Sequence, residues 1–250
     1  MKFLTKQDWE KIINKYNSVK VEKLFFDISQ TIKDLISKGN YDHTTYGIAM
    51  TLFHYYVCFN DIRNIDKIEI CFACLYMSSK IQFRNNSLKY LIQEYKNYIK
   101  INSGVTDKKP DFIKYEIQLY SQLGYDLDIE TPFQFFYNDF FGKLNFNDKE
   151  FANKMNKLKN FCFNLINDTY SRPLSIYYHP KIIYLSCLIF SLKFLEYNEF
   201  EVNELIKNEN ADLIAECMEK IYQIYSKFIE DNTAKSNNNS INNNKKKKVI

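Results

Sequence analysis

The sequence contains Cys74-Leu75-Tyr76-Met77-Ser78-Ser79-Lys80 and repeats its pattern, C-L-x-x-S-x-K, at Cys187-Leu188-Ile189-Phe190-Ser191-Leu192-Lys193. The two copies lie 113 residues apart (187 minus 74), and Ile70 matches Ile183 at the same offset. Both are nearly continuous apolar runs with small residues among them, which is typical of a helix that neighbouring helices surround and approach closely. Each copy is therefore predicted to be the central helix of one of two lobes.

The helices expected around the two copies follow the same order. Only five Gly and four Pro occur in 250 residues, and so few chain breakers favour helices joined by short loops over strands, which need frequent turns. Apolar residues at helical spacing predict five helices for each lobe. These are 20–38, 43–58, 65–81, 86–99 and 110–123, then 131–142, 148–169, 180–196, 201–207 and 210–229.

The two ends of the chain are expected to differ from these lobes. Thr5 is suited to cap a short amphipathic helix over residues 5–16, which carries Trp9, Ile12 and Ile13. From about residue 232 the chain consists mainly of Asn, Ser and Lys, which bury too little apolar surface to repay the entropy of ordering. This segment is expected to be a disordered tail.

The formal net charge of +4 says little about the folded part, because Lys245 to Lys248 contribute four positive charges in the tail. A protein that neutralises phosphates usually carries a basic stripe on its folded surface, and the body of this chain is close to neutral. Direct nucleic-acid binding is therefore not expected. An N-terminal apolar run and an apolar stretch of eighteen residues are both missing, so we expect an intracellular, soluble protein that does not bind a membrane.

The sequence offers no set of residues for catalysis or metal binding. Cys71 and Cys74 form a C-x-x-C, but they lie in a predicted buried helix without a second pair to complete a zinc site. The three histidines, at 43, 54 and 179, lack metal-ligand spacing, and His54 is expected to be a hydrogen-bonded core residue. Phosphate-loop, metalloprotease and nucleophile-elbow motifs are absent from the sequence. We expect no cofactor, no metal, no small-molecule ligand and no enzymatic activity.

Two successive five-helix lobes, each wrapped around a buried central helix, resemble the paired cyclin boxes of cyclins. Residues 45–56 are similar to the second helix of that box, residues 74–80 to its central segment, and residues 115–127 to the phrase that ends the first box. Residues 165–170 and 174–183 are similar to cyclins K, T and Q. The chain thus resembles the transcription-type branch of the family, to which cyclins L and C also belong.

The resemblance implies an all-α fold of two tandem five-helix cyclin-box lobes with a short N-terminal helix and a disordered C-terminal tail. The expected domains are an N-terminal helix over 1–19, a first cyclin box over 20–128, a second cyclin box over 129–231 and an Asn/Lys-rich tail over 232–250.

The function implied by the resemblance is that of a cyclin, a regulatory subunit that binds and activates a cyclin-dependent serine/threonine protein kinase, here a transcription-associated one. An alternative is a general transcription factor of the same fold, although such a DNA clamp needs a basic stripe on its lobes. A scaffold without kinase activation is a third possibility, because Gln82 and Phe83 stand where the family has an acidic pair. A nuclear location is expected, with the cytoplasm as a second one. Lys245 to Lys248 fit either a nuclear-import signal or a solubilising end.

The resemblance also implies the residues that bind the kinase. Lys80 and Glu116 would form a pair that holds the kinase-facing surface and bonds the backbone of the partner. Tyr120, Tyr125 and Leu127 match positions that form the pocket for an apolar side chain from the regulatory helix of the kinase. Ile81 flanks this pocket.

Spacing alone supports Glu116 and leaves other interpretations open. Ile113, Glu116, Tyr120 and Leu123 recur at helical spacing, which places a carboxylate within an apolar stripe, and a buried charge is costly unless it is paired. Glu116 could instead lie at the margin of the stripe in contact with solvent. Lys80 could simply interact with the negative end of its helix, and Tyr120, Tyr125 and Leu127 could be core residues.

Overall fold

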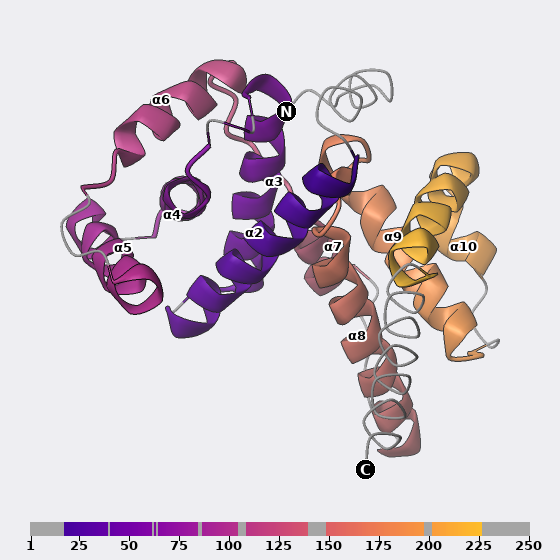
Figure 1. Ribbon diagram of the computed structural model, residues 1–250. Helices are drawn as coiled ribbons and strands as arrows, with labels where there is room; N and C mark the ends of the chain where they lie inside the picture. The colour runs from indigo at the N-terminus through magenta and orange to yellow at the C-terminus, as the bar shows by residue number, and fades with distance from the viewer. Residues whose placement is uncertain are drawn as a thin grey trace, which may run out of the picture.

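The structure of the protein is a computed structural model that describes a large part of the chain. Within this part every regular element is helical and no strand is present, which confirms the all-α prediction (Figure 1). The predicted helix over 5–16 and the predicted tail over 232–250 lie outside the described residues. Those residues are 18–39, 41–61, 63, 65–84, 87–104, 109–139, 149–197 and 202–226, with side chains described for all except 18–20, 149, 150 and 203.

The first group of helices surrounds α4 (Lys67–Ile81). Figure 1 shows α4 end-on, and it packs against the four other helices of the group. Buried residues occur on all sides of α4, from Glu69 to Ser79, as predicted for a central helix. The other four helices are α2 (Ser18–Lys38), α3 (His43–Phe59), α5 (Leu88–Ser103) and α6 (Phe112–Gln122).

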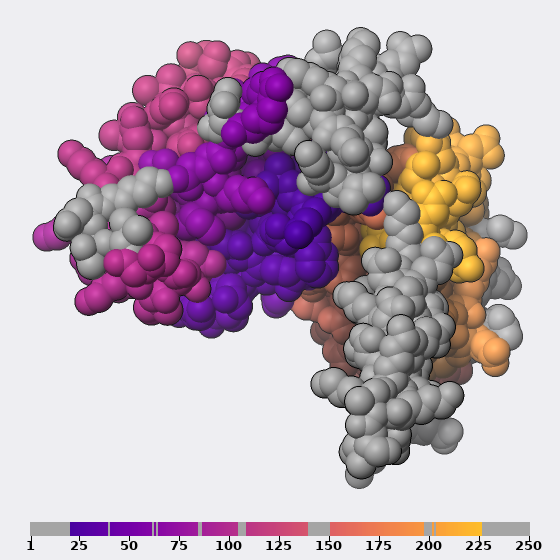
Figure 2. All heavy atoms as spheres, viewed as in Figure 1, coloured from indigo at the N-terminus to yellow at the C-terminus, as the bar shows by residue number. Residues whose placement is uncertain are grey.

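The second group is arranged around α9 (Pro180–Phe194), which is buried nearly all round. It packs against α7, α8, α10 and a short 3-10 helix, η2. Figure 2 shows the two groups as two adjoining masses. The elements around α9 are α7 (Pro132–Asn138), α8 (Lys149–Thr169), η2 (Pro173–Ile176), α10 (Val202–Ile206) and a helix formed by residues 211–226.

The predicted repeat extends to the bounds and caps of the two central helices. Both α4 and α9 have 15 residues, and both ends are offset by 113 (180 minus 67, and 194 minus 81). The cap residues before them, Asp66 and His179, keep this offset, and each side chain accepts a hydrogen bond from a backbone N–H of the first turn. Since these features extend beyond the seven matching residues, the two groups are built on the same local plan.

Helix α3 joins the two groups, because it contacts α7 and η2 as well as the first group. His54 on α3 is fully buried, and its ring nitrogens lie 3.0 Å from Ser175 Oγ and 3.2 Å from the Tyr170 carbonyl oxygen. Gly47 on the same helix leaves room for the second group, since a Cβ there would lie 2.7 Å from the Tyr170 hydroxyl and 3.0 Å from Thr131 Cγ2. The prediction of a hydrogen-bonded core histidine at 54 is confirmed.

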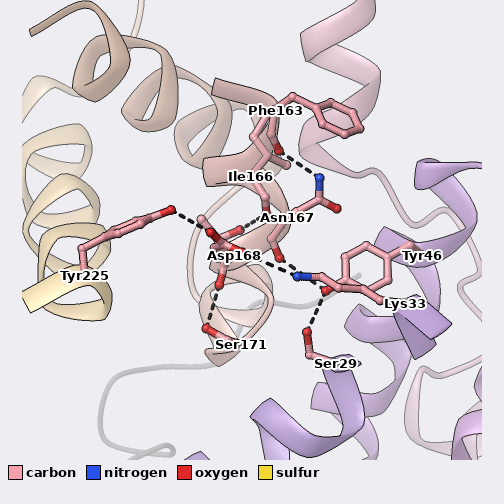
Figure 3. A network of polar contacts seen from close by, with 10 residues as sticks. Ser29, Lys33, Tyr46, Phe163, Ile166, Asn167, Asp168, Ser171 and Tyr225 are labelled. Carbon is pink, nitrogen blue, oxygen red and sulfur yellow. Dashed lines mark hydrogen bonds and ion pairs between the residues drawn. The ribbon is translucent and has the colours of Figure 1, made fainter. Parts of the chain in front are cut away.

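A network of polar side chains connects the groups beside α3 (Figure 3). Asp168 on α8 accepts a hydrogen bond of 2.8 Å from the Tyr225 hydroxyl and lies 3.5 Å from Lys33 Nζ on α2. Tyr46 on α3 lies 2.9 Å from Ser29 Oγ and donates to the Asn167 carbonyl at 3.3 Å. These contacts fix α8 against α2 and α3. Among the described helices, none is both long and apolar enough to cross a membrane.

Candidate functional site

Lys80 and Glu116 form an ion pair between the last turn of α4 and the middle of α6. The Lys80 Nζ lies 2.5 Å from Glu116 Oε1 and 4.4 Å from the centre of the Tyr76 ring. The side chain of Glu116 is 12% exposed and that of Lys80 is 41% exposed. Partial burial of Lys80 lowers its pKa, but the contacts with Glu116 and Tyr76 outweigh this and raise the pKa above its ordinary value. Lys80 is therefore a fixed cation at neutral pH.

The local structure explains why α4 and α6 hold these residues side by side. The carboxylate of Glu69, which is buried on α4, accepts a hydrogen bond from the backbone N–H of Asp111. Asp111 in turn caps α6, because its side chain accepts from the backbone N–H of Lys114 at 3.1 Å. The Glu69 carboxylate thus bonds the start of α6 to α4. The ion pair of Lys80 and Glu116 is a second contact between the two helices further along.

A pocket of about 570 Å³ opens beside this ion pair. Four of the six predicted site residues line it, namely Lys80, Ile81, Tyr120 and Leu127. The two others adjoin it, since Glu116 is bonded to Lys80 and the ring of Tyr125 stacks on Tyr120 at a centroid distance of 6.4 Å. The structure therefore brings all six together on one surface. Other residues in the wall are Thr44, Ile48, Gln82, Phe83, Asp128, Ile129 and Gln134.

The predicted apolar stripe of α6 is partly wrong. Ile113 was expected to be buried with Leu123, but its side chain is 53% exposed. The buried residues of α6, which packs against α4 and α3, are instead Phe112, Tyr115 and Leu119. Glu116 lies beside this face, mostly buried and paired with Lys80.

A second face of α6 is apolar and open to solvent. Ile113 and Ile117 are both more than half exposed, and they are spaced with Glu116 and Tyr120 at i, i+3, i+4 and i+7 along the helix. This spacing places the four residues on one side of α6. The sequence does not predict Ile117 as a site residue, because apolar residues at helical spacing do not reveal which of two apolar faces the chain itself buries. Leu127 is half-buried, and it both packs against the core and lines the pocket.

The buried thiols and histidine do not contribute to this surface. Cys71 and Cys74 lie fully buried within α4, and burial raises the pKa of both thiols well above the ordinary value, so neither forms a reactive thiolate. Burial lowers the pKa of His54 to about 3, although the contact with the Tyr170 carbonyl opposes this. Within the described residues, no cluster of three or more His, Cys, Asp and Glu side chains could hold a metal ion.

Comparison with known proteins shows which molecules the chain resembles. No model of a known protein family matches the chain. Cyclin-K of Danio rerio is 21% identical over 209 residues, which cover 78% of this chain and 48% of the relative. Cyclin-K of Homo sapiens is 22% identical over 212 residues, which cover 78% of this chain and 35% of the relative. The chain is therefore similar to cyclins over most of its length. It spans about half the length of these curated relatives or less.

Three solved structures share the fold of this chain. A chain of the yeast TFIIK (Kin28/Ccl1/Tfb3) complex matches with a TM-score of 0.61 at 18% identity, covering 88% of this chain and 96% of the other. A chain of the yeast RNA Pol II CTD kinase CTDK-1 complex matches with a TM-score of 0.65 at 12% identity, covering 90% and 73%. A chain of the CAK complex of Chaetomium thermophilum matches with a TM-score of 0.60 at 14% identity, covering 82% and 62%.

Proposed function

We propose that the chain is the regulatory subunit of a transcription-associated cyclin-dependent protein kinase, which it binds and activates without a catalytic site of its own. We assign residues 20–128 and 129–231 as its two cyclin boxes and the nucleus as its place of action. The observation that carries the proposal is the surface formed by α4 and α6, where a fixed ion pair, an open pocket and exposed apolar side chains adjoin one another.

The chemistry of this surface fits a helix of a partner protein. Exposed apolar patches of this kind on a folded protein mark interaction sites, and Ile113, Ile117 and Tyr125 are all more than half exposed here. Tyr120 and Leu127 form apolar walls of a pocket large enough for a side chain. The Lys80 ammonium has further donor capacity beside its bond to Glu116, which suits a backbone carbonyl of the partner.

Binding of this kind activates a kinase through a shift between two conformations. A kinase with its regulatory helix swung outward cannot pair the glutamate of that helix with the lysine that holds ATP, so phosphoryl transfer is slow. A cyclin surface that binds only the inward form stabilises the active arrangement. Moving such an equilibrium from 1:99 to 99:1 needs a differential affinity of about 5.5 kcal/mol, which an interface of roughly 1,200–2,000 Å² is able to supply.

The comparisons support a transcription-associated partner. The two curated relatives are both Cyclin-K, and the similar solved chains come from assemblies whose names include TFIIK and the RNA Pol II CTD kinase CTDK-1. We infer that the partner of this chain is a kinase of the same class.

The proposal is tested by affinity purification of the tagged full-length chain from cells of its source organism, followed by identification of the co-purifying kinase and an assay of its activity. We expect a serine/threonine kinase that is recovered with the wild-type chain and is active in the eluate. Recovery of a folded chain with general transcription factors or DNA, and without kinase activity, would instead support the alternative of a transcription-factor core.

A further inference from the structure

Phe83 follows α4 in a backbone conformation that few residues other than glycine and asparagine adopt. Its φ is 53°, in the left-handed region where a Cβ crowds the neighbouring carbonyl oxygen. The backbone there closes the helix, because Phe83 N donates to the Lys80 carbonyl at 3.0 Å and Arg84 N donates to the Ser79 carbonyl at 2.9 Å. Helix caps of this kind favour glycine at the left-handed position. The preference of the cap for glycine therefore does not explain a phenylalanine at this position.

The second lobe contains the same cap with a different side chain. Glu196 stands 113 residues after Phe83 and has a φ of 57°. Its N–H donates to the Lys193 carbonyl at 3.2 Å, and Tyr197 N donates to the Leu192 carbonyl at 2.9 Å, which repeats the hydrogen bonds of the first cap. A polar residue therefore adopts the same backbone conformation with the same hydrogen bonds, so the cap does not require an aromatic ring.

Packing within the chain does not explain the ring of Phe83 either. Its side chain is 94% exposed, the highest value among the large hydrophobic residues described. Water contact with a whole phenyl ring is unfavourable, and strained backbone conformations that persist despite their cost tend to cluster at functional sites. Both costs together point to a role outside the folded chain itself.

The surroundings of Phe83 indicate what kind of surface it meets. Phe83 lines the same pocket as Lys80. The cations beside it are already paired within the chain, since Lys80 bonds to Glu116 and Arg84 bonds to Asp42. Tyr125, the other aromatic residue with a positive φ among those described, is 77% exposed at the end of α6. The area thus presents aromatic groups and internally neutralised charges.

We propose that Phe83 is a specificity anchor, whose ring enters an apolar hollow of the bound kinase and selects a partner with an apolar rather than a charged surface at this place. The inference rests on the proposed function, because the occupant is the kinase that contacts the pocket beside Phe83. Aromatic side chains that fill a partner's pocket carry a large share of binding energy. The cap fixes the backbone and the direction of the Cα–Cβ bond of Phe83 before binding, which reduces the entropy lost in the complex.

The test uses the kinase that co-purifies with the wild-type chain, produced separately, and measures its Kd for the full-length chain and its variants. Phe83→Gly keeps the backbone that the cap prefers, so we expect an unchanged or higher Tm together with binding at least tenfold weaker. Phe83→Glu, which copies the second lobe, is expected to weaken binding at least as much. The matched control Glu196→Gly changes the equivalent cap and should leave the Kd unchanged.

Two results would overturn the inference, and only one of them would also contradict the proposed function. If the wild-type chain binds the kinase and Phe83→Gly binds within twofold of it, the anchor is wrong while the proposed function stands. If no kinase binds the wild-type chain, the proposed function and the anchor are both wrong.

Discussion

Glu116 accepts a hydrogen bond of 2.5 Å from Lys80, and this contact joins α6 to the C-terminal turn of α4 at the rim of the pocket. Because Lys80 is partly exposed, the pair contributes little to stability, about 1 kcal/mol or less. Lys80→Ala and Glu116→Ala should therefore keep their helical signal and most of their stability. Each is expected to reduce recovery of the kinase by about tenfold, which corresponds to roughly 1.4 kcal/mol. Recovery is measured by quantitative affinity purification.

The second lobe offers a matched control for this prediction. Lys181 and Glu209 form an ion pair of 2.6 Å with similar exposure, at the start of α9 and away from the pocket. Lys181→Ala should change stability about as much as Lys80→Ala and leave kinase recovery intact. Equal recovery with Lys80→Ala and Glu116→Ala combined would count against the assignment of this surface.

The exposed face of α6 gives a prediction that does not depend on charge removal. Ile117 is 63% exposed, so Ile117→Asp should alter the free energy of unfolding by no more than about 0.5 kcal/mol. It places an unpaired carboxylate within the proposed interface, where desolvation is costly. We expect kinase recovery to fall at least tenfold. The same exchange at Ile101, exposed on α5, should have no effect on recovery, and a loss with both variants would indicate a general effect of added charge.

His54 predicts how stability depends on pH. Its pKa is about 3 in the folded chain because of burial, against an ordinary value of 6.5. Between these values the unfolded chain binds a proton that the folded chain does not, so His54 lowers the free energy of unfolding as the pH falls. The slope approaches about 1.4 kcal/mol per pH unit. Well above pH 6.5 the histidine is neutral in both states and adds no pH dependence.

Urea unfolding at several pH values between 4 and 8 measures this contribution. His54→Gln should be less stable at pH 8, because it disturbs a buried hydrogen-bonded site, but its stability should fall less steeply with acid. If the free energy of unfolding falls equally steeply with acid in His54→Gln and in the wild-type chain, His54 is not the source of the pH dependence.

Gly47 predicts a loss of stability where helix propensity alone predicts a gain. Alanine is favoured over glycine within a helix by about 1 kcal/mol, yet a Cβ at position 47 would lie 2.7 Å from the Tyr170 hydroxyl. Gly47→Ala should therefore destabilise the chain by roughly 1–3 kcal/mol. The double variant with Tyr170→Phe removes the oxygen and should recover part of this loss in thermal unfolding. A Tm of Gly47→Ala above that of wild type would show that the two lobes do not pack closely at α3.

The duplicated central helices predict equal costs for equivalent substitutions. Leu75 and Leu188 are offset by 113 residues, and both are buried in the middle of their helices. Leu75→Ala and Leu188→Ala should each cost about 2–5 kcal/mol in the free energy of unfolding. Leu213→Ala, at a partly exposed position, should cost much less. A small effect of either central substitution in chemical denaturation would contradict a buried core helix in that lobe.

The helices and their repeat could be predicted from the sequence because both are local patterns. Apolar spacing located each α-helix of the described residues to within a few residues, and the match between Cys74 and Cys187 revealed the offset that the two central helices keep. The left-handed caps after α4 and α9 could not be predicted from the sequence. Phe83 and Glu196 are not residues that usually occupy a left-handed position. At both positions the left-handed backbone accompanies the hydrogen bonds that close α4 and α9.

The site was predictable only in part. The resemblance placed Lys80 and Glu116 together, as the structure does, but Ile113 was assigned to the wrong environment because spacing does not distinguish a face buried by the chain from a face left open to a partner. The partners of His54 could not be foreseen. Ser175 lies 121 residues away in the sequence, and such long-range contacts depend on how the two lobes meet.

The central proposal is tested most directly by titrating the purified partner kinase with the full-length chain and measuring phosphoryl transfer to a peptide substrate. If the chain binds the inward form of the regulatory helix, activity should rise saturably with one chain per kinase and remain low with Lys80→Ala combined with Glu116→Ala. A kinase that binds the wild-type chain at saturation and shows the same activity as the kinase alone would contradict the proposed function.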